Sequence, residues 1–214
     1  MVAVIAAVIV VVLVVPGSAP APVTPSSLIT TFLPGEIQQV PQACPSVPAS
    51  VVSDYLPGQV KRAAPPPLDG VLDSQCDWTL DQRPVYRLLQ LDVQAYVPNG
   101  LASGDGSATF AAIDAYAQAM QGKQDPARDT GAPRAQITLL KGLGTAAFTA
   151  TQVYLVGGAV TDVATTFVRY RNVLITVTLS GLDKSNNGHY GPVAMSQLSA
   201  GSLAVARATF AKLA

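Results

Sequence analysis

The chain has 214 residues, of which 13 are Lys or Arg and 13 are Asp or Glu, so its formal net charge is zero. A neutral chain without a basic stripe has no general attraction for nucleic acid, which excludes that class of partner. Only 12% of the residues are charged and 49% are hydrophobic, and the length is sufficient for one domain with a substantial core.

An unbroken apolar run opens the chain, because residues 2–15 have the sequence VAVIAAVIVVVLVV. Its length is typical of a signal-peptide core and slightly short for a bilayer span. The first cation of the chain is Lys61, so the usual positive residues before such a core are missing, and a cut after Ala21 would leave Pro22 directly behind it. We interpret residues 1–16 as a signal peptide or membrane anchor and favour the uncleaved anchor. Either one exports the rest of the chain.

Residues 17–42 form a Pro-rich stretch whose composition is typical of an extended linker that cannot pack a core. Leu28, Ile29 and Phe32 leave open a short helical turn that docks onto the domain, but the composition favours a spacer. We therefore expect a single extracytoplasmic domain over residues 43–214.

Cys44 and Cys76 are the two cysteines of the chain. In an exported protein an even pair indicates a disulfide, and two buried free thiols are the alternative. A bridge would close a loop of about 30 residues and contribute about 3 kcal/mol to stability. Two cysteines and one histidine cannot fill a zinc site, so we expect no metal and no other cofactor.

The first elements of the domain are a helix and two strands. Residues 46–56 have an apolar face and end at Pro57-Gly58, which predicts a helix, and residues 59–73 are Pro-rich and predict an exposed loop. Residues 76–80 and 86–97 predict strands, the second with apolar and polar residues in alternation. Trp78 lies in the first strand. It marks a ligand site or, more commonly beside a disulfide, packs in the core.

A helix follows the Gly-rich loop at residues 99–106. Its apolar residues fall on one stripe, which we expect to face the core: Phe110, Ile113, Ala117 and Met120. Short strand candidates follow between residues 136 and 156.

Residues 163–179, VATTFVRYRNVLITVTL, predict a β-hairpin because strand formers flank Arg171 and Asn172. Asn tolerates the positive φ that a tight turn needs. A two-residue loop pairs Tyr170 with Val173 and places a nearly continuous apolar set on one face of the hairpin.

Residues 181–191 are polar and predict a loop, and Pro192 precedes a last helix with a broad apolar stripe. The sequence of elements predicts an α+β domain with a mainly antiparallel sheet and helices packed on one face.

Several short motifs carry a resemblance through their order and spacing. They are Cys44, Tyr55-Leu56-Pro57-Gly58, Cys76-x-Trp78, Leu89-x-Leu91-x-Val93 with Tyr96, Gly142 to Phe148, and Val168-Arg169-x-x-Asn172-Val173. Over residues 40–214 the chain resembles a family of exported actinobacterial proteins of unknown function, many of them lipoproteins. Its layout is also distantly similar to sensor domains of mycobacterial receptor kinases, which implies binding rather than catalysis. The chain departs from the family at Thr145-Ala146, where acidic residues are usual. It also lacks a lipobox, so anchoring would depend on the apolar run.

Catalytic patterns are weak. His189 is the one histidine of the chain and lies in a polar, Gly-flanked segment, where a surface histidine is the common case. No Gly-x-Ser-x-Gly pattern accompanies it, so we assign no catalytic residue.

Arg169 and Arg171 join Trp78 as candidate binding residues. Arg169 lies on the polar face of the predicted hairpin, with Arg171 at its tip. Such a pair can receive an anionic ligand, whereas the structural alternative is pairing of Arg169 with Asp92 or Asp162.

Two functions from different classes follow. The first is a non-catalytic, membrane-tethered extracytoplasmic module that binds an unknown ligand or a cell-envelope partner, and the alternative is an envelope hydrolase with an unrecognised active site. A cleft with convergent polar groups and carboxylates of shifted pKa would favour the enzyme. A groove lined by apolar and Arg side chains would favour binding.

Overall fold

The structure is a computed structural model that describes residues 29–66, 72–99, 106–125, 134–156, 159–184 and 190–214. The strands are β1 (Lys61–Ala63), β2 (Leu72–Gln82), β3 (Val85–Ala95), β4 (Gln136–Leu140), β5 (Ala146–Val156), β6 (Ala159–Tyr170), β7 (Val173–Lys184) and β8 (Tyr190–Pro192). The helices are α1 (Ala43–Ser46), α2 (Ala49–Tyr55), α3 (Ala108–Gln124) and α4 (Met195–Phe210).

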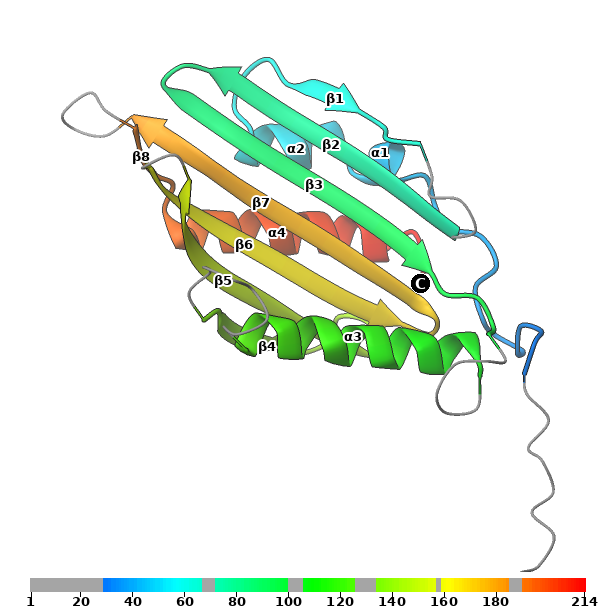
Figure 1. Cartoon of the computed structure of the whole chain (residues 1–214). Helices are drawn as coiled ribbons and strands as arrows, with labels where there is room; N and C mark the ends of the chain where they lie inside the picture. The colour runs from blue at the N-terminus through cyan, green and yellow to red at the C-terminus, as the bar shows by residue number, and fades with distance from the viewer. Residues whose placement is uncertain (1–28, 67–71, 100–105, 126–133, 157–158, 185–189) are drawn as a thin grey trace, which may run out of the picture.

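One antiparallel sheet organises the described residues, with strand order β1-β2-β3-β7-β6-β5-β4 (Figure 1). The short strand β8 pairs with the end of β7 beside β6. Every neighbouring pair of strands is antiparallel, and the longest strands, β7 and β6, lie in the interior of the sheet. The predicted α+β class with a mainly antiparallel sheet is therefore confirmed.

The predicted hairpin is confirmed in its register as well as its position. Tyr170 pairs with Val173 and Val168 with Ile175 across β6 and β7. The backbone reaches a positive φ of 54° at Arg171, the first residue of the two-residue loop. Both strands extend beyond the predicted segment, since β6 begins at Ala159 and β7 continues to Lys184.

The two faces of the sheet carry different helices. We call the face with Leu89, Val168 and Ile175 the core face. The larger apolar cluster lies there, and α1, α2 and α4 cover it as expected. Contrary to the expectation that the helices pack on one face, α3 lies on the opposite face, which we call the α3 face, over β6 and β7 (Figure 1). There a second, smaller cluster surrounds Phe148 and Phe167.

The buried stripe of α3 differs from the predicted one. Ala108 and Ala112 are fully buried and Met120 packs against the second cluster, whereas Ile113 is 42% exposed. Alanine side chains let the helix approach the sheet closely. The prediction missed this face because it relied on large apolar residues, and alanine is only weakly hydrophobic.

Helix α4 packs closely on β7 because Gly201 has no side chain at the contact. A Cβ at this position would lie 2.5 Å from Cδ2 of Leu179 and 2.8 Å from Cδ1 of Tyr55. Next to it, the buried Ser202 hydroxyl lies 2.8 Å from Oγ1 of Thr166 on β6, so the helix is joined to the sheet by a polar contact as well.

Residues 33–42 lie against the domain, although the Pro-rich composition predicts a spacer over 17–42. The buried Asn172 side chain accepts a hydrogen bond from Ile37 N (2.7 Å) and donates one to Ile37 O (2.8 Å). Glu36 accepts from the backbone N–H of Thr109 in the first turn of α3 (2.7 Å). Arg171 donates to the carbonyl of Gly35 (2.8 Å). Polar contacts to the backbone, which composition does not reveal, hold this segment in place.

Two predicted loops contain strands, and the first helix is divided. β1 lies within the predicted loop 59–73, and the end of β7 together with β8 lies within the predicted loop 181–191. The predicted helix 46–56 is instead α1 and α2 separated at Val47-Pro48, because Pro48 precedes the first turn of α2.

The predicted anchor at residues 1–16 and the histidine at position 189 lie outside the described residues. No helix in the described part of the chain is long and apolar enough to cross a membrane.

Candidate functional site

A cavity of about 460 Å³ opens on the core face at the edge of the sheet, between α1–α2 and β1–β2. We call it the edge pocket. Its lining residues come from the segment between the two disulfide cysteines and from β2: Cys44, Val47, Ala49, Val52, Ser53, Leu56, Gly58, Val60, Arg62 and Trp78. A cavity of this size is within the range of small-molecule sites.

The inner part of the edge pocket is apolar. Trp78 is 4% exposed, Val52 is 7% exposed and Leu56 is fully buried. Trp78 belongs to the core face because it follows the alternation that also buries Cys76 and Leu80. The core-packing expectation for this tryptophan is confirmed, whereas the ligand-site expectation stays a prediction for a residue that also lines a cavity.

The outer rim carries the charge. Arg62 lies directly opposite Trp78 in the β1–β2 register, and directly paired residues of neighbouring strands share a face. Its side chain is exposed and makes no hydrogen bond or ion pair with any residue that the structure describes. The neighbouring Lys61 pairs with Thr79 and points to the other face.

The predicted disulfide is confirmed and forms one wall of the edge pocket. Cys44 and Cys76 are bonded across a sequence separation of 32 residues, with Cα atoms 5.1 Å apart. The bond fixes α1 to β2, and Cys44 lines the cavity. The wall that carries α1 and the start of α2 is therefore held covalently to the strand that carries Trp78.

The structure does not bring the two predicted arginines to this pocket. Arg171 donates to Gly35 O and its guanidinium lies 5.0 Å from the centroid of the Tyr170 ring, which are structural contacts. Arg169 is half-buried on the α3 face, whereas Trp78 is on the core face. Neither Asp92 nor Asp162 forms the expected ion pair with Arg169 within the described residues. Instead, Arg169 lies close enough to Tyr116 of α3 to oppose the rise in its pKa that burial causes.

A polar region lies on the α3 face over β2 and β3, beyond the strands that α3 covers. Burial, reinforced by the charge of Asp73, raises the pKa of Asp92 from 3.8 to about 6. Its buried Oδ1 has no hydrogen-bond partner within the described residues. Gln75 donates to Asp73 (3.2 Å) and Gln90 donates to Asp77 (3.3 Å), so neighbouring carboxylates are partly satisfied.

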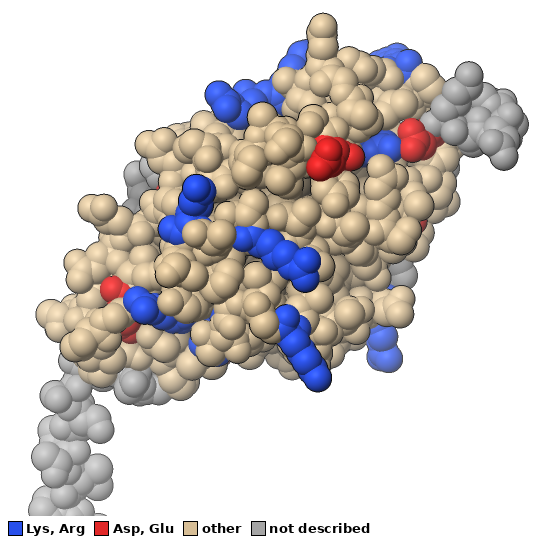
Figure 2. All heavy atoms as spheres, turned by 180° about the vertical axis from the view of Figure 1, so that it is seen from behind, with Lys and Arg blue, Asp and Glu red and all other residues tan. Residues whose placement is uncertain are grey.

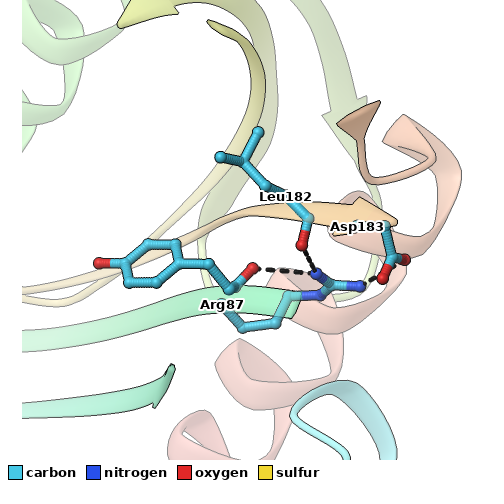
Figure 3. A network of polar contacts seen from close by, with 4 residues as sticks. Arg87, Leu182 and Asp183 are labelled. Carbon is cyan, nitrogen blue, oxygen red and sulfur yellow. Dashed lines mark hydrogen bonds and ion pairs between the residues drawn. The ribbon is translucent and has the colours of Figure 1, made fainter. Parts of the chain in front are cut away.

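Arg87 is a buried cation that sequence reasoning missed (Figure 3). Its Nη1 donates to the carbonyls of Tyr86 (2.9 Å) and Leu182 (2.6 Å), and its Nη2 pairs with Asp183 (2.8 Å). A Cβ at Gly181 would lie 2.6 Å from Cδ of Arg87, so the glycine makes room for this side chain. These contacts join β3 to β7, whereas the buried Nε of the same guanidinium has no hydrogen-bond partner within the described residues.

Metal chemistry finds no support in the arrangement of ligands. Within the described ranges no group of three or more His, Cys, Asp and Glu side chains lies close enough together to hold a metal ion.

Comparisons with known proteins found a distant structural similarity and no match among protein families or curated proteins. Among solved structures, an uncharacterised protein from Mycobacterium smegmatis is similar at 13% sequence identity and a TM-score of 0.35. The match covers 74% of this chain and 94% of that one. A TM-score this low carries no argument about function.

Proposed function

We propose that residues 43–214 form a non-catalytic extracytoplasmic module, tethered by the N-terminal apolar segment, which binds a ligand in the edge pocket. The carrying observation is the pocket itself, a cavity of about 460 Å³ that Trp78, Val52 and Leu56 line together with polar groups, with Arg62 at its rim unpaired among the residues that the structure describes. Such a groove is the feature that favours binding over catalysis.

The disulfide supports the proposed location. Disulfides persist in oxidising compartments outside the cytoplasm and are rare within it. The Cys44–Cys76 bond joins two elements of the domain, so its presence is coupled to the stability of the fold. Protease treatment of intact cells tests the location. We expect the domain to be digested while a cytoplasmic control stays intact, and equal protection of both would contradict the proposal.

Ligand binding is tested with a neutral apolar fluorophore, N-phenyl-1-naphthylamine, and two matched variants. Ala49 lines the edge pocket and is exposed, so Ala49→Phe fills the cavity without disturbing the core. Ser50 is its exposed neighbour and does not line the cavity, so Ser50→Phe is the control. We expect saturable binding by the wild type and by Ser50→Phe, and at least tenfold weaker binding by Ala49→Phe. Equal binding by all three proteins would place the probe elsewhere and contradict the proposal.

One observation favours the alternative, an envelope hydrolase. Asp92 has a raised pKa beside Asp73, and such a carboxyl is a candidate general acid. If the protein hydrolyses chromogenic esters or glycosides, Asp92→Asn should abolish the activity and Gln90→Asn should leave it unchanged. Absence of turnover with both substrate classes, together with ligand binding in the edge pocket, would favour the binding module.

A further inference from the structure

We infer that the ligand of the edge pocket is a single-chain monoanionic amphiphile, with its carboxylate or phosphate at Arg62 and its apolar chain over Trp78. The inference rests on the proposed binding function and adds the chemical class of the ligand. It depends on the lining of the cavity, the position of Arg62 and the size of the space.

The lining combines buried apolar side chains with polar groups, and its rim carries a cation. Among the lining residues Arg62 carries the one charge, and Ser53 adds a hydroxyl. The Ser53 hydroxyl donates to the carbonyl of Ser50 (2.9 Å), which leaves its oxygen lone pairs as acceptors. A ligand with an apolar body and one polar end matches this division, whereas a ligand polar along its whole length would leave groups unpaired against Val52 and Leu56.

Arg62 lies at the rim of the edge pocket, where its guanidinium can bind an anion. It lies on a three-residue edge strand, on the same face as Trp78, and no described residue pairs with its guanidinium. A guanidinium forms two parallel hydrogen bonds with a carboxylate or phosphate, which favours those groups over a neutral hydroxyl.

The side of the molecule that carries α4 displays separate Lys and Arg side chains, with Asp and Glu side chains among them (Figure 2). No continuous charged patch is visible on this side, so the preference for an anion rests on Arg62.

The size of the cavity limits the ligand to one chain. A water molecule occupies about 30 Å³ of the liquid, so about 460 Å³ holds about fifteen groups of similar size. A single chain of about ten carbons with its headgroup fills that space. The second chain of a lipid with two long chains would lie outside this space.

The test compares three probes with the same ten-carbon chain: decanoate, decanol and decyltrimethylammonium, all below their micellar concentrations. Trp78 is the single tryptophan of the chain and lines the cavity, so its fluorescence reports occupancy directly, and calorimetry supplies the affinity. We expect decanoate to bind at least threefold more tightly than decanol, and the cation to bind least.

Two neighbouring variants isolate the role of the arginine. Arg62→Gln and Lys61→Gln remove the same charge from the same exposed strand, but on opposite faces. We expect Arg62→Gln to weaken decanoate binding at least threefold without affecting decanol, and Lys61→Gln to leave both unchanged. Equal effects of the two variants, or equal affinity for decanoate and decanol, would overturn the inference while leaving a binding pocket in place. If neither decanoate, decanol nor the neutral fluorophore binds, the proposed function itself fails.

A final arm separates a free acid from a membrane lipid. Sedimentation with vesicles of phosphatidylglycerol or phosphatidylcholine should show no Arg62-dependent binding. Retention on phosphatidylglycerol that Arg62→Gln abolishes would overturn the single-chain assignment.

Discussion

Removal of the Cys44–Cys76 disulfide gives the sharpest test of how this domain is stabilised. The bond closes a loop with a sequence separation of 32 residues. In the chain-entropy model a loop of about 32 residues lowers the entropy of the unfolded chain by an amount worth about 3.7 kcal/mol at 25 °C. Domains are typically stable by about 5–15 kcal/mol, so this is a large share of the total. For a domain of this length the loss corresponds to a fall in Tm of about 7–15 °C.

The assay is urea unfolding of the wild type with and without reductant, compared with a variant in which both cysteines are alanine. Cys76 is fully buried, and alanine avoids placing a new hydroxyl in the core. We expect the reduced wild type and the double variant to be similarly destabilised, by about 3–4 kcal/mol relative to the oxidised wild type. Reductant should not change the double variant. A difference below about 1 kcal/mol between oxidised and reduced wild type would refute the loop-closure reasoning.

The remaining predictions concern the core, one carboxyl group and the N-terminal segment. Ile175→Asp should unfold the domain because it buries an unpaired charge, whereas Leu139→Asp at an exposed position of the edge strand β4 should cost less than about 1 kcal/mol; circular dichroism distinguishes them. The pKa of Asp92 is raised from 3.8 to about 6, so its contribution to stability is fully present below about pH 4 and is lost as the pH rises towards 6. The pKa shift corresponds to a change in the free energy of unfolding of at most about 3 kcal/mol, which partial exposure of Asp92 reduces to about 1–2 kcal/mol. Asp92→Asn should remove this pH dependence in unfolding titrations. An unchanged profile would show that Asp92 is not its source. Asn172→Ala should cost about 2–4 kcal/mol by leaving the backbone groups of Ile37 unpaired, and hydrogen exchange should accelerate at the Ile37 amide; unchanged exchange there would contradict the contact.

The hairpin illustrates what the sequence predicts well. β-branched and aromatic residues flank a two-residue loop in β6 and β7, and the buried face allows one register only. A slip by one residue would expose Val168 and Ile175, which are fully buried. Local pattern and tertiary packing agree here, so position and pairing were both predictable.

The edge pocket was not predictable, for reasons that lie in its parts. β1 has three residues inside a Pro-rich segment and carries no alternation long enough to detect. Without that strand, Arg62 has no assigned face and cannot be placed beside Trp78. The sequence predicts that Trp78 packs in the core, because a lone tryptophan beside a disulfide is commonly a core residue. Its place in the lining of the cavity depends on α1 and α2, which come from an earlier part of the chain.

Arg87 and Asn172 show two further limits. The alternation through Leu89 and Leu91 places Arg87 on the apolar face, so strict counting along β3 would have identified a buried cation. Asn172 carried a signal only for a turn. Its hydrogen bonds to Ile37 and Tyr96 join segments separated by 135 and 76 residues, and no local pattern reports such contacts.

The attachment of residues 33–42 sets the smallest unit that can be expected to fold independently. A chain shortened to begin at Ala43, where α1 starts, would retain all strands and helices of the described residues. It would nevertheless remove both hydrogen bonds between the buried Asn172 amide and Ile37, and it would remove Glu36 from the first turn of α3. Soluble versions of this protein should therefore begin before Leu33, since the boundary of the folded unit is set by these hydrogen bonds rather than by the first regular element.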